Sequence, residues 1–301
     1  MLALTIPLLL ALLVILAIIC LIRKKWKAAS LLLVVTFALN WWSDCFCFGF
    51  KHNYEGHFKV LSINVNGSGG YNESKANSIL ELIKVENPDI LFLTESFCPL
   101  GDSLYSRLQK GYLFSTRVLR HNEIYSKFPI SNIKYFERLN DGTSYIIQCE
   151  VKINNHIAKI VGSHLSSNNY SYDLNYLTPS DVGEFPDVIK YVDNIKNASR
   201  LRELEAQTIA NEIKGNKYSI VMGDLNDVSG SPALRTLENI GMKDAWCEGG
   251  FGYGATIHNP FPFRIDHVLF GTGFKLKGIK IVDTCFCSDH DALVAVFDFV
   301  D

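Results

Sequence analysis

The sequence has no Lys/Arg-rich run after residue 50, and it has no helix-turn-helix or zinc-finger motif. Residues 51–301 carry 25 Lys and Arg against 30 Asp and Glu, a net charge of −5. Proteins that grip long duplexes through phosphate contacts are usually basic on one face. The composition therefore disfavours a protein that binds duplexes by charge alone.

The eight cysteines include no C-x₂-C pair, which is the spacing typical of zinc sites. Cys45 and Cys47 form one C-x-C pair, and Cys285 and Cys287 form another. A zinc site is therefore not expected. In an oxidising compartment a disulfide would be possible. Otherwise we expect Cys285 and Cys287 to share one face of a core strand. The sequence also lacks internal repeats and low-complexity tracts.

Charge is absent from the first apolar run, Leu2–Ile22. A run of about 20 apolar residues is long enough to cross a bilayer as a helix. A cleaved signal peptide would normally carry basic residues before its apolar part. Here the basic segment Arg23–Lys27 follows that part instead, so we expect an uncleaved membrane anchor.

The second apolar run, Ala28–Trp42, is short for a membrane span. Extending it to Phe50 would place Asp44 near the interface, and the pair of tryptophans before Ser43 suits a membrane surface. The anchor, residues 1–50, therefore has one or two transmembrane helices. If its basic residues stay cytoplasmic, a two-helix hairpin places the rest of the chain outside the cytoplasm. We expect that arrangement; a single span would reverse it.

Residues 56–301 show the alternation of strands and helices typical of an α/β domain. Apolar strands are expected at Phe58–Val65 and Asp89–Ser96, with an amphipathic helix between them that stops at Pro88. A hairpin turning at Asn154–Asn155 follows. Further elements are a helix capped by Ser199, strands at "SIVMGD", "RIDHVLF" and "ALVAVFDF", and a helix around "SPALRTLENIG". The Tyr-rich stretch Asn168–Asp193 is expected to be a long surface loop, with a helical end as the alternative.

Polar residues recur where these strands end. Each one alone is explained by a turn or a cap. Together they supply what phosphate-ester chemistry needs. Carboxylate and amide oxygens suit a hard divalent cation, and His paired with a carboxylate can deprotonate water. Further donors and the cation stabilise the charge that develops on phosphorus. The residues are Asn64, Glu95, His164, Asp224, Asn226, Asp266, Asp289 and His290.

These motifs, in this order, resemble the endonuclease/exonuclease/phosphatase superfamily. The matching segments are the strand ending at Asn64, the strand-end Glu95, "SHL", "GDLND", "RIDH" and the closing "SDH", spread over Phe58–Val300. The resemblance implies a four-layered α/β sandwich of two packed mixed β-sheets flanked by helices. One departure is that Thr94 precedes the glutamate, where the family often has Gln.

The resemblance also implies roles for these residues. Glu95 would bind Mg²⁺ or Mn²⁺ with Asn64 beside it, and Asp289 would add a metal ligand. Asp224 and Asn226 would position water and phosphate. Asp266 would orient His290, the general base or transition-state stabiliser, and His164 would donate to phosphate or the leaving group. We expect His267 to point away from the site and Asp291 to be solvated, while Arg264 makes either a strand salt bridge or a phosphate contact.

The resulting expectation is a membrane-anchored, metal-dependent phosphoesterase. In having a histidine at position 164, the chain resembles the deoxyribonuclease-like and sphingomyelinase-like branches of the family. The substrate would be a nucleic acid, a nucleotide, a phospholipid or a phosphorylated sugar head group, with residues 168–193 as a selector. The alternative is a non-catalytic binding module at the membrane surface. Neither requires an obligatory protein partner.

Overall fold

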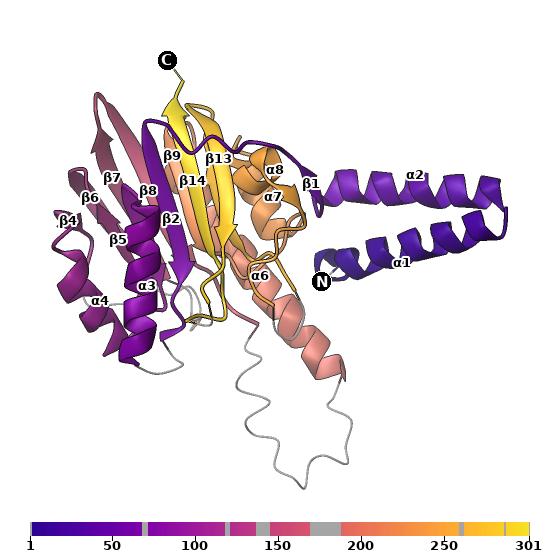
Figure 1. The fold of residues 1–301 in the computed structure, drawn as a ribbon, viewed down its shortest axis with the longest axis horizontal. Coiled ribbons are helices and arrows are strands. Elements are labelled where there is room, and N and C mark those ends of the chain that lie inside the picture. Colours follow the sequence, from indigo (N-terminus) through magenta and orange to yellow (C-terminus); the bar gives the residue numbers. More distant parts are fainter. Residues whose placement is uncertain are drawn as a thin grey trace, which may run out of the picture.

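The computed structural model of the chain describes residues 2–67, 72–117, 121–136, 145–168, 188–258, 262–285 and 287–300. It confirms the predicted α/β architecture, in which two mixed sheets pack face to face and helices cover their outer faces (Figure 1). Two apolar helices precede this sandwich and project from it as a hairpin. The Tyr-rich segment expected to select substrate lies outside the described residues over positions 169–187.

The first sheet has the strand order β13-β14-β2-β3-β5-β4, with β2 parallel to β3 and antiparallel to β14. Its strands are β2 (Phe58–Asn64), β3 (Ile90–Thr94), β4 (Phe114–Ser115), β5 (Glu123–Ser126), β13 (Phe274–Val282) and β14 (Ala292–Phe299). Helices α3 (Glu73–Glu86) and α4 (Leu100–Leu108) contribute the buried residues that cover its outer face. The sequence patterns did not predict α4 or β13.

The second sheet has the strand order β10-β12-β9-β8-β7-β6, with β8 parallel to β9 and β9 antiparallel to β12. Its strands are β6 (Ile130–Phe136), β7 (Tyr145–Ile153), β8 (His156–His164), β9 (Ser219–Asp224), β10 (Lys243–Asp244) and β12 (Asp266–Phe270). Helices α6 (Val188–Ile213) and α7 (Pro232–Glu238) pack on its outer face. The β7–β8 hairpin turns at Asn154–Asn155, as predicted.

Helix α6 begins at Val188, so the predicted start at Ser199 is wrong. Ile195 and Ala198 are both buried and continue the buried face of the helix toward its N-terminus. The segment before Ser199 therefore gains packing by staying helical. Helix α3 follows its sequence signals more closely, because the side chain of Asn72 accepts a hydrogen bond from the Ser74 backbone N–H, 2.8 Å away.

The aromatic ring of Phe92 in one sheet packs against two glycines, Gly162 and Gly223, in the other sheet. Phe92, on β3, is fully buried in the core between the sheets. A Cβ added to Gly162 on β8 would run into that ring, and a Cβ on Gly223 of β9 would meet both the ring and the Ser163 carbonyl. Gly223 also has a φ of +139°, which side chains rarely adopt. These glycines let the sheets approach closely beside the strand ends that carry the polar residues.

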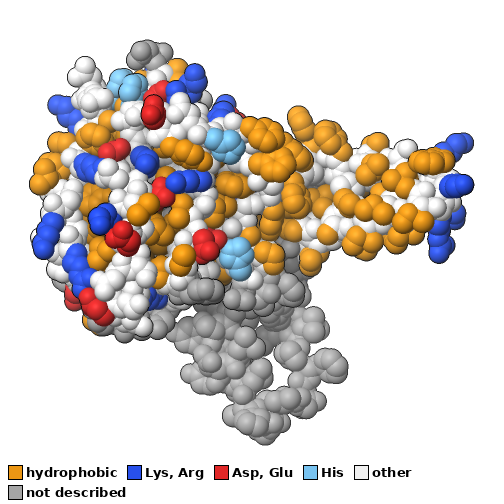
Figure 2. All heavy atoms as spheres, in the orientation of Figure 1, with side chains coloured by type: hydrophobic (Ala, Val, Ile, Leu, Met, Phe, Trp, Pro, Cys, Tyr) orange, Lys and Arg blue, Asp and Glu red, His pale blue; other side chains and the backbone are white. Residues whose placement is uncertain are grey.

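Helices α1 (Leu2–Ile22) and α2 (Trp26–Ser43) form the hairpin. Figure 2 shows apolar side chains over its surface and basic side chains at its far tip. Within the described residues one helix, α1, is long and apolar enough to cross a membrane, over Thr5–Ile22. Helix α2 exposes large apolar side chains too, including Phe37 and Trp41. The chain thus has one candidate N-terminal membrane anchor helix.

The base of the hairpin packs against the sandwich. Ile6, Leu10 and Cys45 form a buried cluster with Val228. Helix α2 ends at Ser43, where Asp44 adopts a left-handed conformation, so it does not extend toward Phe50. Instead β1 (Cys47–Phe48) pairs with β11 (Phe251–Gly252), and α8 (Ala245–Gly249) lies beside them.

The expectation that Cys285 and Cys287 share a core strand face is wrong. Strand β13 ends at Val282, and both cysteines follow it. Cys285 is exposed and has a φ of +50°, whereas Cys287 is buried. The chain turns between β13 and β14 at this point, so the C-x-C spacing has no strand on which to place both side chains together.

We expect Gly162→Ala to lower the free energy of unfolding by about 1–3 kcal/mol, because the added methyl group overpacks the contact with Phe92. Chemical denaturation followed by circular dichroism measures this. Combining the change with Phe92→Leu should recover part of the loss, which shows coupling between the two positions. Gly111→Ala is the control, since a Cβ there meets only the Leu108 carbonyl oxygen at 3.9 Å. An equal loss of unfolding free energy at Gly111 and at Gly162 would contradict a close contact between Gly162 and the Phe92 ring.

Candidate active site

The polar residues of the site continue the inter-sheet faces of the strands. Side chains along a strand point alternately to its two faces. On β9, Ile220 and Met222 belong to the core between the sheets, and Asp224 is the next residue on that face. On β8, Ile160 belongs to the same core, and the alternation reaches His164. The site is therefore the polar end of the hydrophobic core between the sheets.

Strand register places these ends side by side. His164 pairs with Asp224 across β8 and β9, and Asp224 pairs with Asp266 across β9 and β12. On the other sheet, Asn64 at the end of β2 pairs with Thr94 at the end of β3, just before Glu95. Separate chain segments therefore bring their polar ends together, and this follows from the register of the strands in the two sheets.

The Asp224 carboxylate is the centre of the arrangement. It is 2% exposed, and its Oδ2 accepts a hydrogen bond from Asn64 Nδ2 at 3.0 Å. The same oxygen lies 3.7 Å from Nε2 of His164 and 3.8 Å from Nε2 of His290. One carboxylate oxygen thus faces an amide and two imidazoles. The two longer distances leave both rings without a direct hydrogen bond to it.

Glu95 reaches the same place from β3. Its backbone has a φ of +54°, a left-handed conformation that is uncommon for glutamate. This turn ends the strand and directs the carboxylate toward β2, where Oε1 accepts a hydrogen bond from Asn64 Nδ2 at 3.0 Å. The same oxygen lies 3.7 Å from Nε2 of His164. Unusual backbone conformations of this kind cluster at functional sites.

His290 is held by Asp266. Its Nδ1 lies 2.8 Å from Asp266 Oδ2, and both side chains are buried. Burial alone would lower the pKa of His290, but the charges of Asp266 and Asp224 outweigh that effect and raise this pKa to about 10. Burial also raises the pKa of Asp266, against the charge of His290. The ring therefore carries a proton at neutral pH and directs Nε2 toward Asp224.

Within the described part of the chain, two groups of side chains could hold a cation. One consists of Glu95, His164 and Asp224, and the other of Asp224, Asp266 and His290; within each group the ligand atoms lie within 4.8 Å of one another. Asp266 is already committed to His290. The first group offers two carboxylates, the donors that a hard cation such as Mg²⁺ or Mn²⁺ prefers. These residues fit a divalent cation between Glu95 and Asp224.

Asn64 lies beside that position, as expected, but its amide oxygen does not face it. Oδ1 accepts a hydrogen bond from the Asn66 backbone N–H at 2.9 Å, while Nδ2 donates to both carboxylates. In this orientation Asn64 holds the two acids together in the way a cation would. Its role as a ligand stays a prediction, because it requires the amide to turn over.

Asn226 and Asp289 lie at the edge of the site. Asn226 has a φ of +51°, and its Nδ2 donates to the carbonyl of Leu165 at 2.9 Å, next to His164. Asp289 is exposed and belongs to neither candidate cation group. Its charge contributes to raising the pKa of His290. Its predicted role as a metal ligand remains untested.

Sequence reasoning missed two residues that hold the site together. Ser288 Oγ donates to the Asn64 carbonyl at 2.7 Å and accepts a hydrogen bond from the His290 N–H at 3.1 Å. It thereby links the segment before β14 to the end of β2. Thr256 Oγ1 accepts from the backbone N–H of Asp266 at 3.1 Å. The serine in the "SDH" motif was a usable signal for Ser288, but Thr256 has no local signature.

A buried network fixes the loops that follow β8 and β9. Arg202 on α6 is fully buried, and its Nε donates to Asp227 Oδ2 at 3.1 Å. Its Nη1 donates to the carbonyl of Ser166 at 2.9 Å and to Asn168 Oδ1 at 2.9 Å. Glu205, one turn along, accepts from the N–H and hydroxyl of Ser166 at 2.9 and 2.5 Å. Helix α6 thus positions the loops beside His164 and Asp224.

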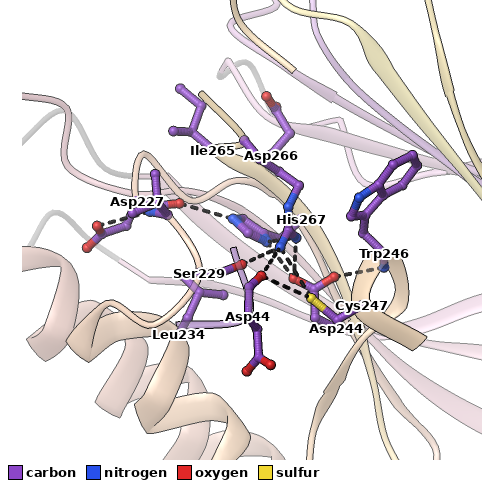
Figure 3. Close-up of polar contacts among 12 residues, drawn as sticks. Asp44, Asp227, Ser229, Leu234, Asp244, Trp246, Cys247, Ile265, Asp266 and His267 are labelled. Atoms are coloured by element: carbon purple, nitrogen blue, oxygen red, sulfur yellow. Dashed lines mark hydrogen bonds and ion pairs between the residues drawn. The ribbon is translucent and has the colours of Figure 1, made fainter. Parts of the chain in front are cut away.

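Arg264 and His267 belong to a separate cluster on the other face of β12. Arg264 Nη1 donates to Asp244 Oδ2 at 2.6 Å, and His267 Nδ1 lies 2.8 Å from the same oxygen. His267 Nε2 lies 3.0 Å from the Asp227 carbonyl. Figure 3 shows Asp244 and His267 turned toward one another, with the Asp44 carboxylate pointing away from them and Asp266 leaving the strand on the opposite side. His267 therefore points away from the site, and Arg264 makes a buried salt bridge.

The charge of Asp244 is stabilised by these partners. Burial by itself would raise the pKa of Asp244, but the charge of Arg264 and the hydrogen bond from His267 lower it well below its usual range. Arg264 also donates to Ser229 and, at 3.4 Å, to the carbonyl of Asp44 at the end of α2. The cluster therefore joins the hairpin to the strand that carries Asp266.

Comparison with known proteins agrees with this geometry. The sequence profile of the Endonuclease/Exonuclease/phosphatase family matches residues 61–290. Curated protein sequences yield no match to the chain. Its fold is similar to that of the endonuclease/exonuclease/phosphatase from Bacteroides vulgatus, with a TM-score of 0.57, 17% sequence identity and coverage of 81% of this chain and 99% of that one.

Two further solved structures share the fold. D. rerio TDP2 complexed with single strand DNA product gives a TM-score of 0.58 at 16% identity, covering 80% of this chain and 98% of that chain. A mutant of beta toxin from Staphylococcus aureus with bound magnesium ions gives 0.54 at 15% identity, covering 79% and 99%. At these identities the likeness concerns the fold alone.

We expect Asp244→Asn to lower the free energy of unfolding by about 3–5 kcal/mol at pH 7, because it leaves the Arg264 charge buried and uncompensated. A lowered pKa stabilises the fold above the unfolded value of about 4, and the contribution is lost as pH falls toward the folded value. The difference between the two proteins should therefore shrink below about pH 4. Denaturation at pH 7 and pH 3 measures it. A pH-independent difference would contradict the assigned charge.

Proposed function

The chain belongs to the Endonuclease/Exonuclease/phosphatase family, and on that premise we propose that it is a membrane-anchored, metal-dependent phosphoesterase. One observation carries the proposal. The Asp224 carboxylate meets Asn64, His164 and His290, which come from separate strand ends, and Glu95 lies beside them. Carboxylates, an amide and two imidazoles around one point form the inventory that hydrolysis of a phosphate ester requires.

The protein supplies positions and charges for this chemistry. A divalent cation bound by Glu95 and Asp224 would polarise a phosphoryl oxygen and offset its negative charge. Asp224 and Asn226 would then orient water and phosphate from one side. His164, with Nε2 directed at both carboxylates, would donate to a phosphoryl oxygen or to the leaving group. The gaps of 3.7 and 3.8 Å around Asp224 Oδ2 leave these groups available to substrate.

Two carboxylates determine the charge of His290. Asp266 and Asp224 together raise the pKa of this ring, so it enters the reaction as an imidazolium able to stabilise charge on phosphorus. The alternative role of the ring is that of general base for the attacking water. The Nδ1–Asp266 bond keeps the ring in place in either role.

Phosphodiesters are the substrate class that we propose, with nucleic acid as the first candidate and a phospholipid head group as the second. The acidic domain disfavours duplex binding by charge alone. The second candidate is supported by exposed aromatic residues beside the base of the hairpin. Phe251 lies 5.1 Å from Phe50 and 6.2 Å from Phe48 between ring centroids, and all three side chains are exposed. Such rings suit the interface of a bilayer.

The hairpin supports an arrangement in which both helices cross the membrane. At 1.5 Å per residue, the 18 residues of α2 extend about 27 Å, close to the hydrocarbon thickness of a bilayer. The basic residues from Arg23 to Lys27 lie at the turn, which we place on the cytoplasmic side. The catalytic domain would then be extracytoplasmic.

The direct test is a substrate panel for the purified full-length protein with Mg²⁺, with Mn²⁺ and with EDTA. It contains plasmid DNA, RNA, bis-(p-nitrophenyl) phosphate, p-nitrophenyl phosphate and sphingomyelin. We expect metal-dependent cleavage of at least one phosphodiester and none in EDTA. Turnover that is unchanged by EDTA would contradict the metal site, and no turnover of any substrate would favour the binding module.

We expect His290→Ala to reduce kcat by about 10²–10⁴, because it removes the group proposed as general base or as stabiliser of the charge on phosphorus. Initial rates with the preferred substrate measure this, and circular dichroism checks that the variant is folded. His258→Ala is the matched control: His258 also lies close to an aspartate, at 2.9 Å from Asp291, but it is exposed and outside both cation groups. A normal rate for the His290 variant would exclude the proposed role.

We expect a periplasmic-type reporter, such as alkaline phosphatase, to be active when fused after Asp301 in a bacterial host, because a two-span hairpin exports the C-terminus. A cytoplasmic reporter at the same position should be inactive. Moving the same fusion to the turn, after Lys25, should reverse both readings. The opposite pattern would show that α2 does not cross and that the domain faces the cytoplasm.

A further inference from the structure

Two thiols meet where the hairpin joins the sandwich. Cys47 and Cys247 are far apart in the sequence, but their Sγ atoms lie 2.6 Å apart. Both sulfurs also lie near the carbonyl oxygen of Asp44, at 3.5 and 3.6 Å. All eight cysteines lie within the described residues and are free, and this is the one sulfur–sulfur contact among those residues.

The backbone holds this pair in register. Cys47 begins β1, which pairs with β11, and Gly49 and Lys51 donate backbone hydrogen bonds to the carbonyls of Gly250 and Gly249 at 2.7 and 2.9 Å. Cys247 lies in α8, just before these carbonyls. The chain that leaves the hairpin is therefore laid along the segment that carries Cys247. The side chains meet because both backbones are fixed, and the contact does not depend on a mobile loop.

The surroundings do not suit a reactive thiol or a metal site. The Arg264 guanidinium lies 3.3 Å from the sulfur of Cys247 and 3.9 Å from that of Cys47, which disfavours a cation. The hydrogen bond with Cys47, followed by burial, raises the pKa of Cys247, so the thiolate needed for nucleophilic chemistry is disfavoured. A covalent link is the remaining chemistry for these two sulfurs in contact, one from a buried residue and one from a half-buried residue.

We propose that Cys47 and Cys247 form a disulfide that fastens the membrane hairpin to the catalytic domain. The reaction joins the two Sγ atoms. During folding, before the two sulfurs are enclosed, two electrons and the two thiol protons pass to a disulfide-bearing protein oxidant of the extracytoplasmic space, which leaves as a dithiol. The inference rests on the extracytoplasmic placement proposed above, because thiols stay reduced in the cytoplasm.

The link would stabilise the joint between the anchor and the site, which is the contact of Asp44 with Arg264. Asp44 ends α2 and its carbonyl accepts from Arg264, two residues before Asp266. A bond between Cys47 and Cys247 closes the chain around this contact, so the hairpin could not swing away while Arg264 stays buried. The closed loop spans most of the sandwich, and long loops gain much from such a link because it restricts the unfolded chain.

The neighbouring cysteine provides a matched control. Cys45 is buried in the apolar cluster with Ile6, Leu10 and Val228 and has no contact with the sulfur of Cys247. It lies on the same segment as Cys47, with the same exposure to an oxidant during folding. Substitution of Cys45 should therefore leave the link intact, whereas substitution of Cys47 should abolish it.

The test uses the full chain in membranes of the expressing bacterium. Free thiols are blocked with N-ethylmaleimide before lysis, and the protein is digested without reductant and analysed by mass spectrometry. We expect a peptide pair joining Cys47 to Cys247, two hydrogens lighter than the separate thiol peptides and lost on reduction. Cys45→Ser should keep this pair, and Cys47→Ser should leave Cys247 alkylated. Alkylation of both cysteines in the wild type, or a link through Cys45, would overturn the proposal.

A second measurement reports on the joint itself. In detergent, a reductant should lower the unfolding midpoint of the wild type by roughly 5–10 °C. It should leave the Cys47→Ser/Cys247→Ser variant unchanged. Hydrolysis is measured on the same samples, and His290→Ala should retain the link. A link without hydrolysis would therefore refute the proposed activity alone, while hydrolysis with free thiols would refute the disulfide alone.

Discussion

The site depends on keeping one carboxylate charged inside the protein. Asp224 ends the central strand of the second sheet, where an unpaired charge would be strongly destabilising. Asn64, His164 and His290 make the charge tolerable, and each comes from a different strand end or from the loop before a strand. Strand register and the close approach of the two sheets are therefore requirements of the site, and a slip of one residue would turn Asp224 to the outer face.

Charges on the two faces of the same strands serve different purposes. Behind β12 and on α6, Asp244 and Arg202 have partners at 2.6–3.1 Å, so these groups are paired and hold loops and the hairpin in place. At the inter-sheet end, Nε2 of His164 and of His290 lies 3.7 and 3.8 Å from Asp224. These two Nε2 atoms therefore lack the short contact with a carboxylate oxygen that the paired groups have. A cation would supply a positive charge to the Asp224 carboxylate, and phosphoryl oxygens would supply acceptors to the two rings.

The sequence was sufficient to predict the sandwich, the order of the motifs and most residues at the strand ends. Period-two patterns mark buried strands, and acids and histidines following them are visible without coordinates. The orientation of the Asn64 amide and the exposure of Asp289 depend on tertiary contacts, so residue order could not indicate them. The buried Arg202 carries no local signal, because an arginine on an amphipathic helix normally faces solvent.

The hairpin and the site are connected through a short path of buried contacts. The carbonyl of Asp44, the residue that follows α2, accepts from Arg264, and Arg264 lies two residues before Asp266, where β12 begins. Arg264 is also paired with Asp244. Moving the hairpin would therefore expose the charge of Arg264 or leave it buried without a partner. If the hairpin is inserted in a membrane as proposed, a rigid joint of this kind would fix the direction in which the strand ends face relative to it. The anchor would thus orient the site as well as localise it, which matters most for a substrate held at the bilayer surface.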